Sequence, residues 1–286
     1  MKAPAFDYIK ARSLDHVFTL LAEHGDEARL LAGGQTLLAT LNMRLSEPAL
    51  LIDINGLENL AGITLQADCL RIGALARHHD IEVSELVARH APLLSLAAPH
   101  VAHRAIRNLG TLGGSLAFAD PAAEWPCCAV ALDATLVLQS QRGERRVPAG
   151  DFFLDLYNTD LRDDELISAC EFPLPTAGQR VVFDELARRH GDYAIVGLAI
   201  RATLVDTVVH DVRLVFLGTG NIPMRARAAE QALEGRTPDA ATIAQAQAQL
   251  ADELRAQADI YHSATTKLQL ACVLLRRLLA RLAQPA

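Results

Sequence analysis

The sequence predicts an α+β fold made of three consecutive units. Residues 1–56 alternate helices with short apolar strands and include a glycine turn, a pattern typical of an α/β unit. Residues 57–176 change to short strands mixed with helices, and residues 177–286 begin with three long apolar strands that precede helices. We therefore place the boundaries near residues 56 and 176 and expect the last unit to be a three-stranded antiparallel sheet plus helices.

In the first unit, Ser13 can cap a helix that Gly25 ends. The apolar run 29–32 then reads as a buried strand that leads into a glycine turn. A short helix over 37–44 and a second strand over 50–54 complete the unit.

The middle unit is expected to combine short strands with helices. The predicted strands cover residues 63–65, 70–72, 135–139, 145–147 and 165–172. The predicted helices cover residues 84–89, 93–107 and 127–132, and a loop runs from 151 to 161.

The last unit begins with strands at 181–186, 194–204 and 209–217, joined by turns. Helical material is expected from Pro223 to 254, and Ser263 caps a final amphipathic helix that reaches about residue 282.

Composition restricts the class of protein. The net charge of −7, from 27 basic and 34 acidic residues, argues against a general nucleic-acid binder. No apolar stretch approaches the roughly 20 residues of a transmembrane helix, and the amino terminus lacks the core of a signal peptide. Five scattered cysteines without Cys-x-x-Cys spacing fit reduced thiols in the cytoplasm and exclude a conventional iron–sulfur site within this chain.

Two glycine turns carry the strongest functional signal. Gly33 and Gly34 follow a strand and precede a helix, where free N–H groups and the helix dipole favour an anion. Gly110, Gly113 and Gly114 form the second turn, beside hydroxyl groups suited to phosphate oxygens. Neither turn matches a Walker loop or a Rossmann fingerprint, and either alone could be a packed turn. Together they suggest one ligand with two phosphates, held from both sides.

The amino-acid sequences of both turns resemble those of a known family. Residues 32–37 read Ala-Gly-Gly-Gln-Thr-Leu, residues 107–117 contain Gly-Thr-Leu-Gly-Gly-Ser, and residues 120–124 read Asp-Pro-Ala-Ala-Glu. Over essentially the whole chain, the sequence resembles the FAD-binding medium subunit of molybdenum hydroxylases, in the xanthine oxidase family and of the carbon monoxide dehydrogenase type. The resemblance implies a two-subdomain FAD-binding unit of the PCMH or vanillyl-alcohol-oxidase-like kind, followed by a C-terminal flavoprotein domain.

The resemblance also implies cofactor-binding residues, and Gln35 in place of a histidine suggests non-covalent FAD. Glu124 would hold the adenosine ribose, a role that we favour over that of a helix N-terminal acid. Tyr193 would cover the isoalloxazine ring, or be a core tyrosine. Asp184 stands where the xanthine oxidase branch has lysine, which leaves direct use of NAD open. The full set is Ala32, Gly33, Gly34, Gln35, Thr36, Thr111, Leu112, Gly113, Gly114, Ser115, Glu124, Leu161 and Tyr193.

We expect no metal site and no catalytic residue in this chain. His100 and His103 have helical i, i+3 spacing, but no nearby carboxylate or cysteine completes a ligand set. His78 and His79 are interpreted as a solvated helix start.

These observations predict an FAD-containing electron-transfer subunit. The resemblance implies a small [2Fe–2S] subunit and a large molybdopterin subunit as partners, in a dimer of heterotrimers, with an external electron acceptor. Two alternatives remain: a self-contained FAD-dependent oxidoreductase with its own substrate pocket, and a nucleotide-binding scaffold without redox activity.

Overall fold

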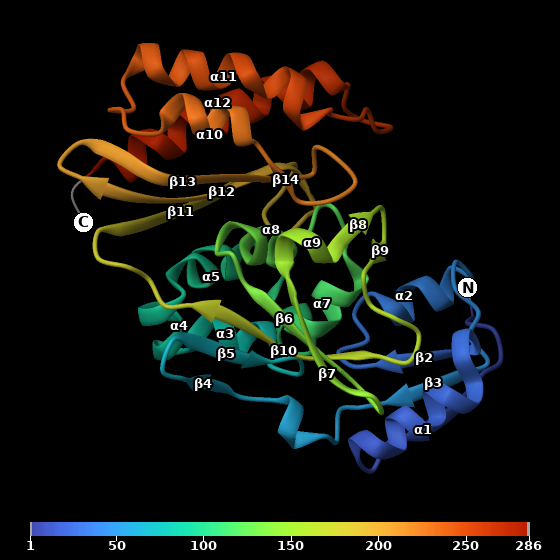
Figure 1. Ribbon diagram of the computed structural model, residues 1–286. Coiled ribbons are helices and arrows are strands. Elements are labelled where there is room, and N and C mark those ends of the chain that lie inside the picture. The colour runs from blue at the N-terminus through green and yellow to red at the C-terminus, as the bar shows by residue number, and fades with distance from the viewer. Residues whose placement is uncertain (1, 285–286) are drawn as a thin grey trace.

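The computed structural model describes residues 2–284 and is built on three principal sheets (Figure 1). A three-stranded, a five-stranded and a four-stranded sheet follow one another along the chain, with helices packed beside them. A small two-stranded hairpin accompanies the middle sheet. This succession confirms the predicted α+β class, whereas the division at residues 56 and 176 stays a prediction.

The first sheet is parallel, with the order β1-β3-β2. Its strands are β1 (Asp7–Lys10), β2 (Ala28–Leu31) and β3 (Leu50–Asp53). The helical segments are α1 (Leu14–His24), η1 (Gly25–Glu27) and α2 (Leu37–Asn42). Strand β1 was not predicted, because its four residues are mostly exposed and show no clear apolar alternation.

The middle sheet is antiparallel, with the order β4-β5-β10-β6-β7. Its strands are β4 (Ile63–Leu65), β5 (Cys69–Gly73), β6 (Thr135–Ser140), β7 (Gly143–Pro148) and β10 (Leu166–Pro173). The predicted loop after residue 151 instead contains α9 (Ala149–Phe152) and a hairpin of β8 (Phe153–Asp155) and β9 (Asn158–Thr159).

The predicted helix over 93–107 is interrupted in the structure. Pro99 removes a backbone donor, and Ala102 adopts a left-handed conformation with φ 46°, so regular helix ends before residue 98 and resumes only at 104. The helical segments of this unit are η2 (Glu58–Leu60), α3 (His78–Val83), α4 (Glu85–His90), α5 (Pro92–Ala97), η3 (Ala98–His100), α6 (Arg104–Arg107), α7 (Leu112–Phe118) and α8 (Glu124–Ala131).

The C-terminal sheet has four strands rather than the three expected. The three long ones are β11 (Gln179–Ala187), β12 (Ala194–Val205) and β13 (Val208–Leu217), and β14 (Met224–Arg225) adds a two-residue edge. Strand β14 occupies the place where helix was predicted to begin after Pro223. The helices are α10 (Arg227–Leu233), α11 (Ala240–Leu254) and α12 (Ala264–Leu282).

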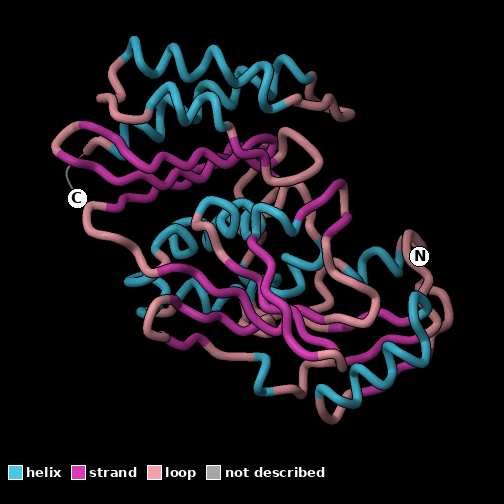
Figure 2. The backbone as a smooth tube through the Cα atoms, in the orientation of Figure 1, coloured by secondary structure: helices cyan, strands magenta, loops and turns pink. Residues whose placement is uncertain are grey.

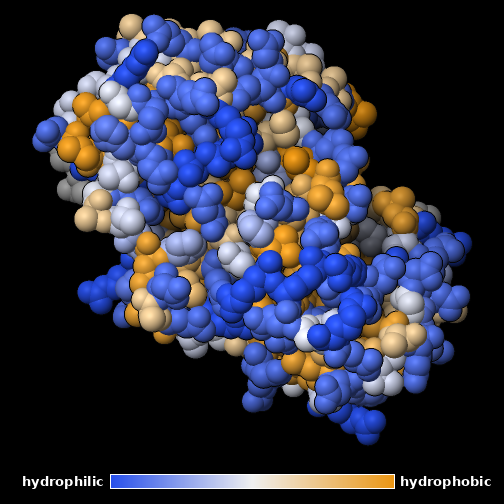
Figure 3. All heavy atoms as spheres, in the orientation of Figure 1, coloured by the Kyte–Doolittle hydropathy of each residue, from blue (hydrophilic) through white to orange (hydrophobic). Residues whose placement is uncertain are grey.

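The C-terminal sheet is covered on both faces. Helices α10, α11 and α12 lie on its outer face, while α5 and α8 of the preceding unit pack against the other face (Figures 1 and 2). The space-filling view narrows between the C-terminal unit and the rest of the molecule, and apolar residues are exposed close to this narrowing (Figure 3). No helix among residues 2–284 is long and apolar enough to cross a membrane.

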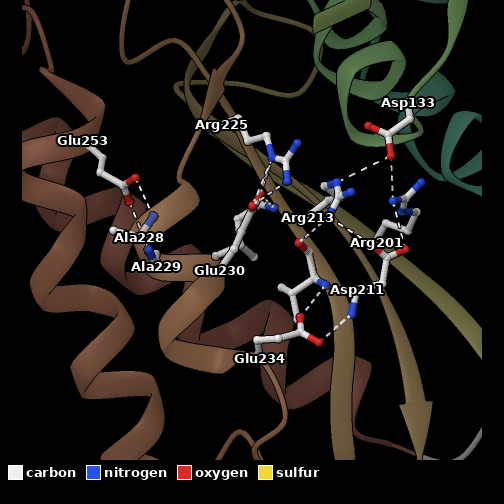
Figure 4. Close-up of polar contacts among 12 residues, drawn as sticks. Asp133, Arg201, Asp211, Arg213, Arg225, Ala228, Ala229, Glu230, Glu234 and Glu253 are labelled. Carbon is white, nitrogen blue, oxygen red and sulfur yellow. Dashed lines mark hydrogen bonds and ion pairs between the residues drawn. The ribbon is translucent and has the colours of Figure 1, made fainter.

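A network of charged side chains joins the middle unit to the C-terminal sheet (Figure 4). The guanidinium of Arg201, on β12, donates to Asp133 at 2.8 Å and to Asp211 at 3.1 Å. Arg213 on β13 lies 3.0 Å from Asp211 and 3.5 Å from Asp133. Because Asp133 follows α8 and the two arginines belong to the C-terminal sheet, the network ties the preceding unit to that sheet.

We expect Arg201→Ala to lower the free energy of unfolding by about 1–3 kcal/mol, because it removes two charged hydrogen bonds while both carboxylates stay hydrated. Urea denaturation followed by circular dichroism measures this loss. Arg142→Ala is the control: this side chain is 59% exposed in its pair with Asp164 and should cost less than about 1 kcal/mol. Equal losses in the two variants would contradict a special role of Arg201.

Candidate functional site

The structure brings the two glycine turns into direct contact. A Cβ atom built on Gly33 would lie 2.8 Å from the Cα of Gly110 and would also clash with the carbonyl oxygen of Leu109. No side chain larger than hydrogen fits there without moving the backbone. The turn before α2 is therefore seated on the turn before α7.

A chain of hydrogen bonds supports the contact between the two turns. The amide of Asn55 donates to the carbonyl of Ala32 at 2.8 Å and to Asp53 at 2.7 Å. Arg77 donates to Asn55 Oδ1 at 2.9 Å and also to the carbonyl of Leu109. Asn55 and Arg77 thus connect one glycine turn to the other.

Asp53 anchors this chain to the first sheet. It accepts hydrogen bonds from the hydroxyl of Tyr8 on β1 and from the backbone of Asn55. Burial favours a higher pKa for Asp53, but the hydrogen bonds from Tyr8 and Asn55 outweigh it and hold the pKa below its usual value. The carboxylate therefore stays ionised and keeps orienting Asn55.

The first turn offers a row of free donors. Gly34 has φ 68°, and within the described part of the chain no acceptor takes the N–H groups of residues 33–37. The side chain of Gln35 folds back onto the carbonyl of Gly33 at 2.8 Å. Consecutive unpaired N–H groups that precede a helix form a concave site for an anion.

In the second turn, the N–H groups of residues 113–115 are already hydrogen-bonded to other groups of the protein. The N–H of Gly113 donates to Ala74 at 2.8 Å, and a Cβ on Gly113 would lie 2.5 Å from the Cβ of Ala74. The hydroxyl of Thr111 accepts the N–H of Gly114 at 3.2 Å, and its carbonyl accepts that of Ser115 at 3.1 Å. Gly114 itself is exposed, and a Cβ there would meet only the hydroxyl of Thr111.

His78 corrects the expectation of a solvated helix start. Its ring is buried, accepts a hydrogen bond from Trp125 Nε1 at 3.0 Å, and lies against Gly110, where a Cβ would come within 2.6 Å. Burial, followed by the charges of Arg77 and Arg107, lowers the pKa of His78 to about 3. The neutral imidazole is thus a permanent support of the second turn.

Glu124 lies in the first turn of α8. This helix packs against the C-terminal sheet, and we call the contact between the middle unit and that sheet the seam. Its residue is 9% exposed, and burial, followed by the charge of Glu185, raises its pKa to about 8. Near neutral pH this carboxyl is therefore largely protonated and can both donate and accept a hydrogen bond. Asp120, four residues earlier, also has a raised pKa because of burial.

The remaining predicted residues differ in exposure. Leu112 is fully buried, and Leu161 is partly buried against the same core. Tyr193 is 72% exposed, and partial burial together with the charges of Asp120 and Glu124 raises its pKa. The structure thus places Tyr193 near Glu124, at the edge of the seam, and not in the core.

His100 and His103 are not joined by a third ligand-type side chain among the described residues. Within residues 2–284, no three His, Cys, Asp or Glu side chains gather closely enough to hold a metal ion. His100 instead faces Glu185 across the seam, with Nδ1 and Oε1 3.7 Å apart.

Comparison with known families accounts for nearly all of this chain. Residues 4–175 match the FAD binding domain in molybdopterin dehydrogenase, and residues 181–282 match the CO dehydrogenase flavoprotein C-terminal domain. The chain belongs to the FAD-binding subunits of the molybdenum hydroxylases. It is a flavoprotein subunit of an oxidoreductase, as the resemblance predicted.

Individual relatives of this FAD-binding subunit cover its full length. It is 40% identical over 282 residues to the 6-hydroxypseudooxynicotine dehydrogenase complex subunit alpha of Paenarthrobacter nicotinovorans, spanning 98% of this chain and 95% of the relative. Quinoline 2-oxidoreductase from Pseudomonas putida 86 matches with a TM-score of 0.94 at 37% identity, covering 99% of both chains. Carbon monoxide dehydrogenase of Hydrogenophaga pseudoflava matches with a TM-score of 0.94 at 32% identity, covering 97% and 96%.

The observed geometry fits FAD in this subunit. The unpaired N–H groups of residues 33–37 suit the pyrophosphate, and Gly114 in the adjoining second turn is exposed. Asn55, Arg77 and His78 hold the turns but were missed, because each acts on residues distant in sequence.

Gly114→Ala and Gly113→Ala should separate binding from folding. A methyl group at Gly114 would lie 2.8 Å from the hydroxyl of Thr111, which can rotate aside, and would otherwise meet open space, so we expect FAD affinity to fall about tenfold or more with only a small loss of stability. The methyl group of Gly113→Ala collides with Ala74, so that variant should lose about 1–3 kcal/mol of stability. Fluorescence titration with FAD and thermal unfolding measure the two effects, and unchanged FAD affinity in Gly114→Ala would argue against ligand contact there.

Glu124 should make the stability of the FAD-free chain depend on pH. Its pKa is about 8 when folded, against an ordinary value of 4.5, so its contribution is complete below pH 4.5 and is lost as pH rises through 8. We expect Glu124→Gln to be more stable than the parent at pH 8–9, by on the order of 1–3 kcal/mol, and equally stable near pH 4.5. Chemical denaturation across this range tests the sign, and a constant difference would show that Glu124 does not titrate there.

Proposed function

We propose that this chain is the FAD-containing electron-transfer subunit of a molybdenum hydroxylase. It would accept electrons from [2Fe–2S] clusters in a small partner subunit and deliver them to an external acceptor. The observation that carries this proposal is the pair of glycine turns with free N–H groups at residues 33–37, within a chain whose whole length matches the family.

The chain's own residues would bind and orient the cofactor. The first turn holds the pyrophosphate through backbone N–H groups, while Thr111 to Ser115 form the opposite wall. Glu124 would bind a ribose, Leu161 would border the cofactor, and Tyr193 would cover the ring system. When bound, FAD supplies a carrier that accepts electrons singly and releases them in pairs.

The absence of an electron source in this chain supports a partner. The five cysteines are free in the structure, and four of them are buried. A flavin site of this kind needs a donor held at a fixed short distance, which favours a stable interface of more than about 1,000 Å². We therefore propose a small iron–sulfur subunit and a large molybdopterin subunit, in a dimer of heterotrimers located in the cytoplasm.

Purification of the tagged chain from its native host tests this assignment. The expected product contains FAD released by acid, iron, and molybdenum, together with two further polypeptides. Metal analysis and denaturing electrophoresis read out the composition. A chain that elutes alone without iron or molybdenum, yet reduces a dye with a substrate, would instead establish the self-contained oxidoreductase.

A further inference from the structure

Glu185 carries an unusual buried carboxyl group. It lies in β11, which packs on α5 of the FAD-binding domain, and its side chain is only 4% exposed. Its Oε2 is buried and accepts no hydrogen bond from any residue that the structure describes. Its Oε1 lies 3.7 Å from Nδ1 of His100, which is too far for a hydrogen bond.

Glu124 provides a second carboxyl on the opposite side of the same seam. The charge of Glu185 reaches Glu124 and also the buried thiols of Cys127 and Cys128 on α8. The charge of Asp120, in the loop before α8, also influences Glu124, and Glu124 in turn influences Tyr193, in the loop after β11. The FAD-binding domain and the C-terminal domain thus each contribute one buried acid, and no arginine or lysine among residues 2–284 forms an ion pair with either.

The chemistry of this pair selects a class of ligand. A buried acceptor without a donor typically costs about 1–3 kcal/mol, so such groups are retained where a ligand supplies the missing donor. A phosphate diester carries no proton at neutral pH and so cannot donate to the unpaired oxygen of Glu185, and no third ligand is present among the described residues to hold a cation. A neutral donor fits this place, and FAD carries hydroxyl groups of that kind on its adenosine ribose and on its ribityl chain.

We propose that Glu185 is a cofactor-binding residue, contributed by the C-terminal domain, which together with Glu124 exchanges hydrogen bonds with sugar or ribityl hydroxyl groups of the dinucleotide. This inference rests on the proposed FAD function and deepens it. The two parts of the site then divide the ligand by charge: the backbone donors at residues 33–37 take the pyrophosphate, and the two acids take the hydroxyl groups.

Glu185→Gln and His100→Gln distinguish ligand binding from a structural pairing. If Glu185 binds FAD, Glu185→Gln should raise the dissociation constant for FAD about tenfold or more, while His100→Gln changes it less than about threefold. The FAD-free Glu185→Gln chain should unfold at the same temperature as the parent or a higher one, because the carboxyl oxygen Oε2 accepts no hydrogen bond that the substitution could remove. A residue that served only to hold His100 would instead lower the unfolding temperature in both variants alike.

Two FAD analogues identify the hydroxyl group. One lacks the 2′-hydroxyl of the adenosine ribose, and the other lacks the 2′-hydroxyl of the ribityl chain. The parent and Glu185→Gln should bind one of these analogues with equal affinity, because the hydroxyl that Glu185 recognises is then absent. Glu185→Asp, which keeps the charge but shortens the side chain, should weaken FAD binding and gives a second, independent variant.

The outcomes are separable from those of the proposed function. If the parent chain binds FAD, and Glu185→Gln and Glu185→Asp bind it just as tightly, the role of Glu185 is overturned while the FAD function stands. If the parent chain itself fails to bind FAD, the proposed function falls, and the inference falls with it.

Discussion

The contact between Gly33 and the backbone of Leu109 and Gly110 is the constraint on which the site depends. Two turns that are far apart in sequence touch through main-chain atoms, so their separation is fixed by van der Waals radii and not by adaptable side chains. Asn55 and Arg77 then hold the turns in one orientation through hydrogen bonds. The row of free N–H groups consequently has a defined direction relative to the middle sheet.

Electrostatics divide the surroundings of these turns into two kinds of environment. Backbone donors dominate at residues 33–37, where a helix begins, whereas Asp120, Glu124 and Glu185 make the seam with the C-terminal domain acidic. A long ligand with an anionic middle and neutral hydroxyl groups matches this alternation. Under the proposed function, binding would therefore involve both domains.

Local sequence patterns predicted most of the elements but few of their long-range partners. The capped helices beginning after Ser13 and Ser263, and the three long C-terminal strands, follow from periodicity and capping, and the structure contains them. The predicted helix over 93–107 is interrupted in the structure, because Pro99 removes a backbone donor that the apolar pattern alone does not take into account.

The candidate site shows the same division. The glycine turns could be recognised because their residue types recur at short spacing. The burial of His78 against Trp125, 47 residues away, depends on tertiary packing that no local pattern records. The seam between Glu124 and Glu185 likewise joins residues from different domains, so their mutual influence is visible only in three dimensions.

The pairing of Trp125 with His78 also gives this protein an intrinsic optical probe. Trp125 is the sole tryptophan of the chain, is 1% exposed, and donates a hydrogen bond to His78, which lies against Gly110 of the second glycine turn. Since the neighbouring imidazole of His78 stays neutral throughout the physiological pH range, no change of charge on His78 quenches the emission of Trp125. Ultraviolet fluorescence therefore reports on the packing of this one turn, without any label and without a background from other indoles.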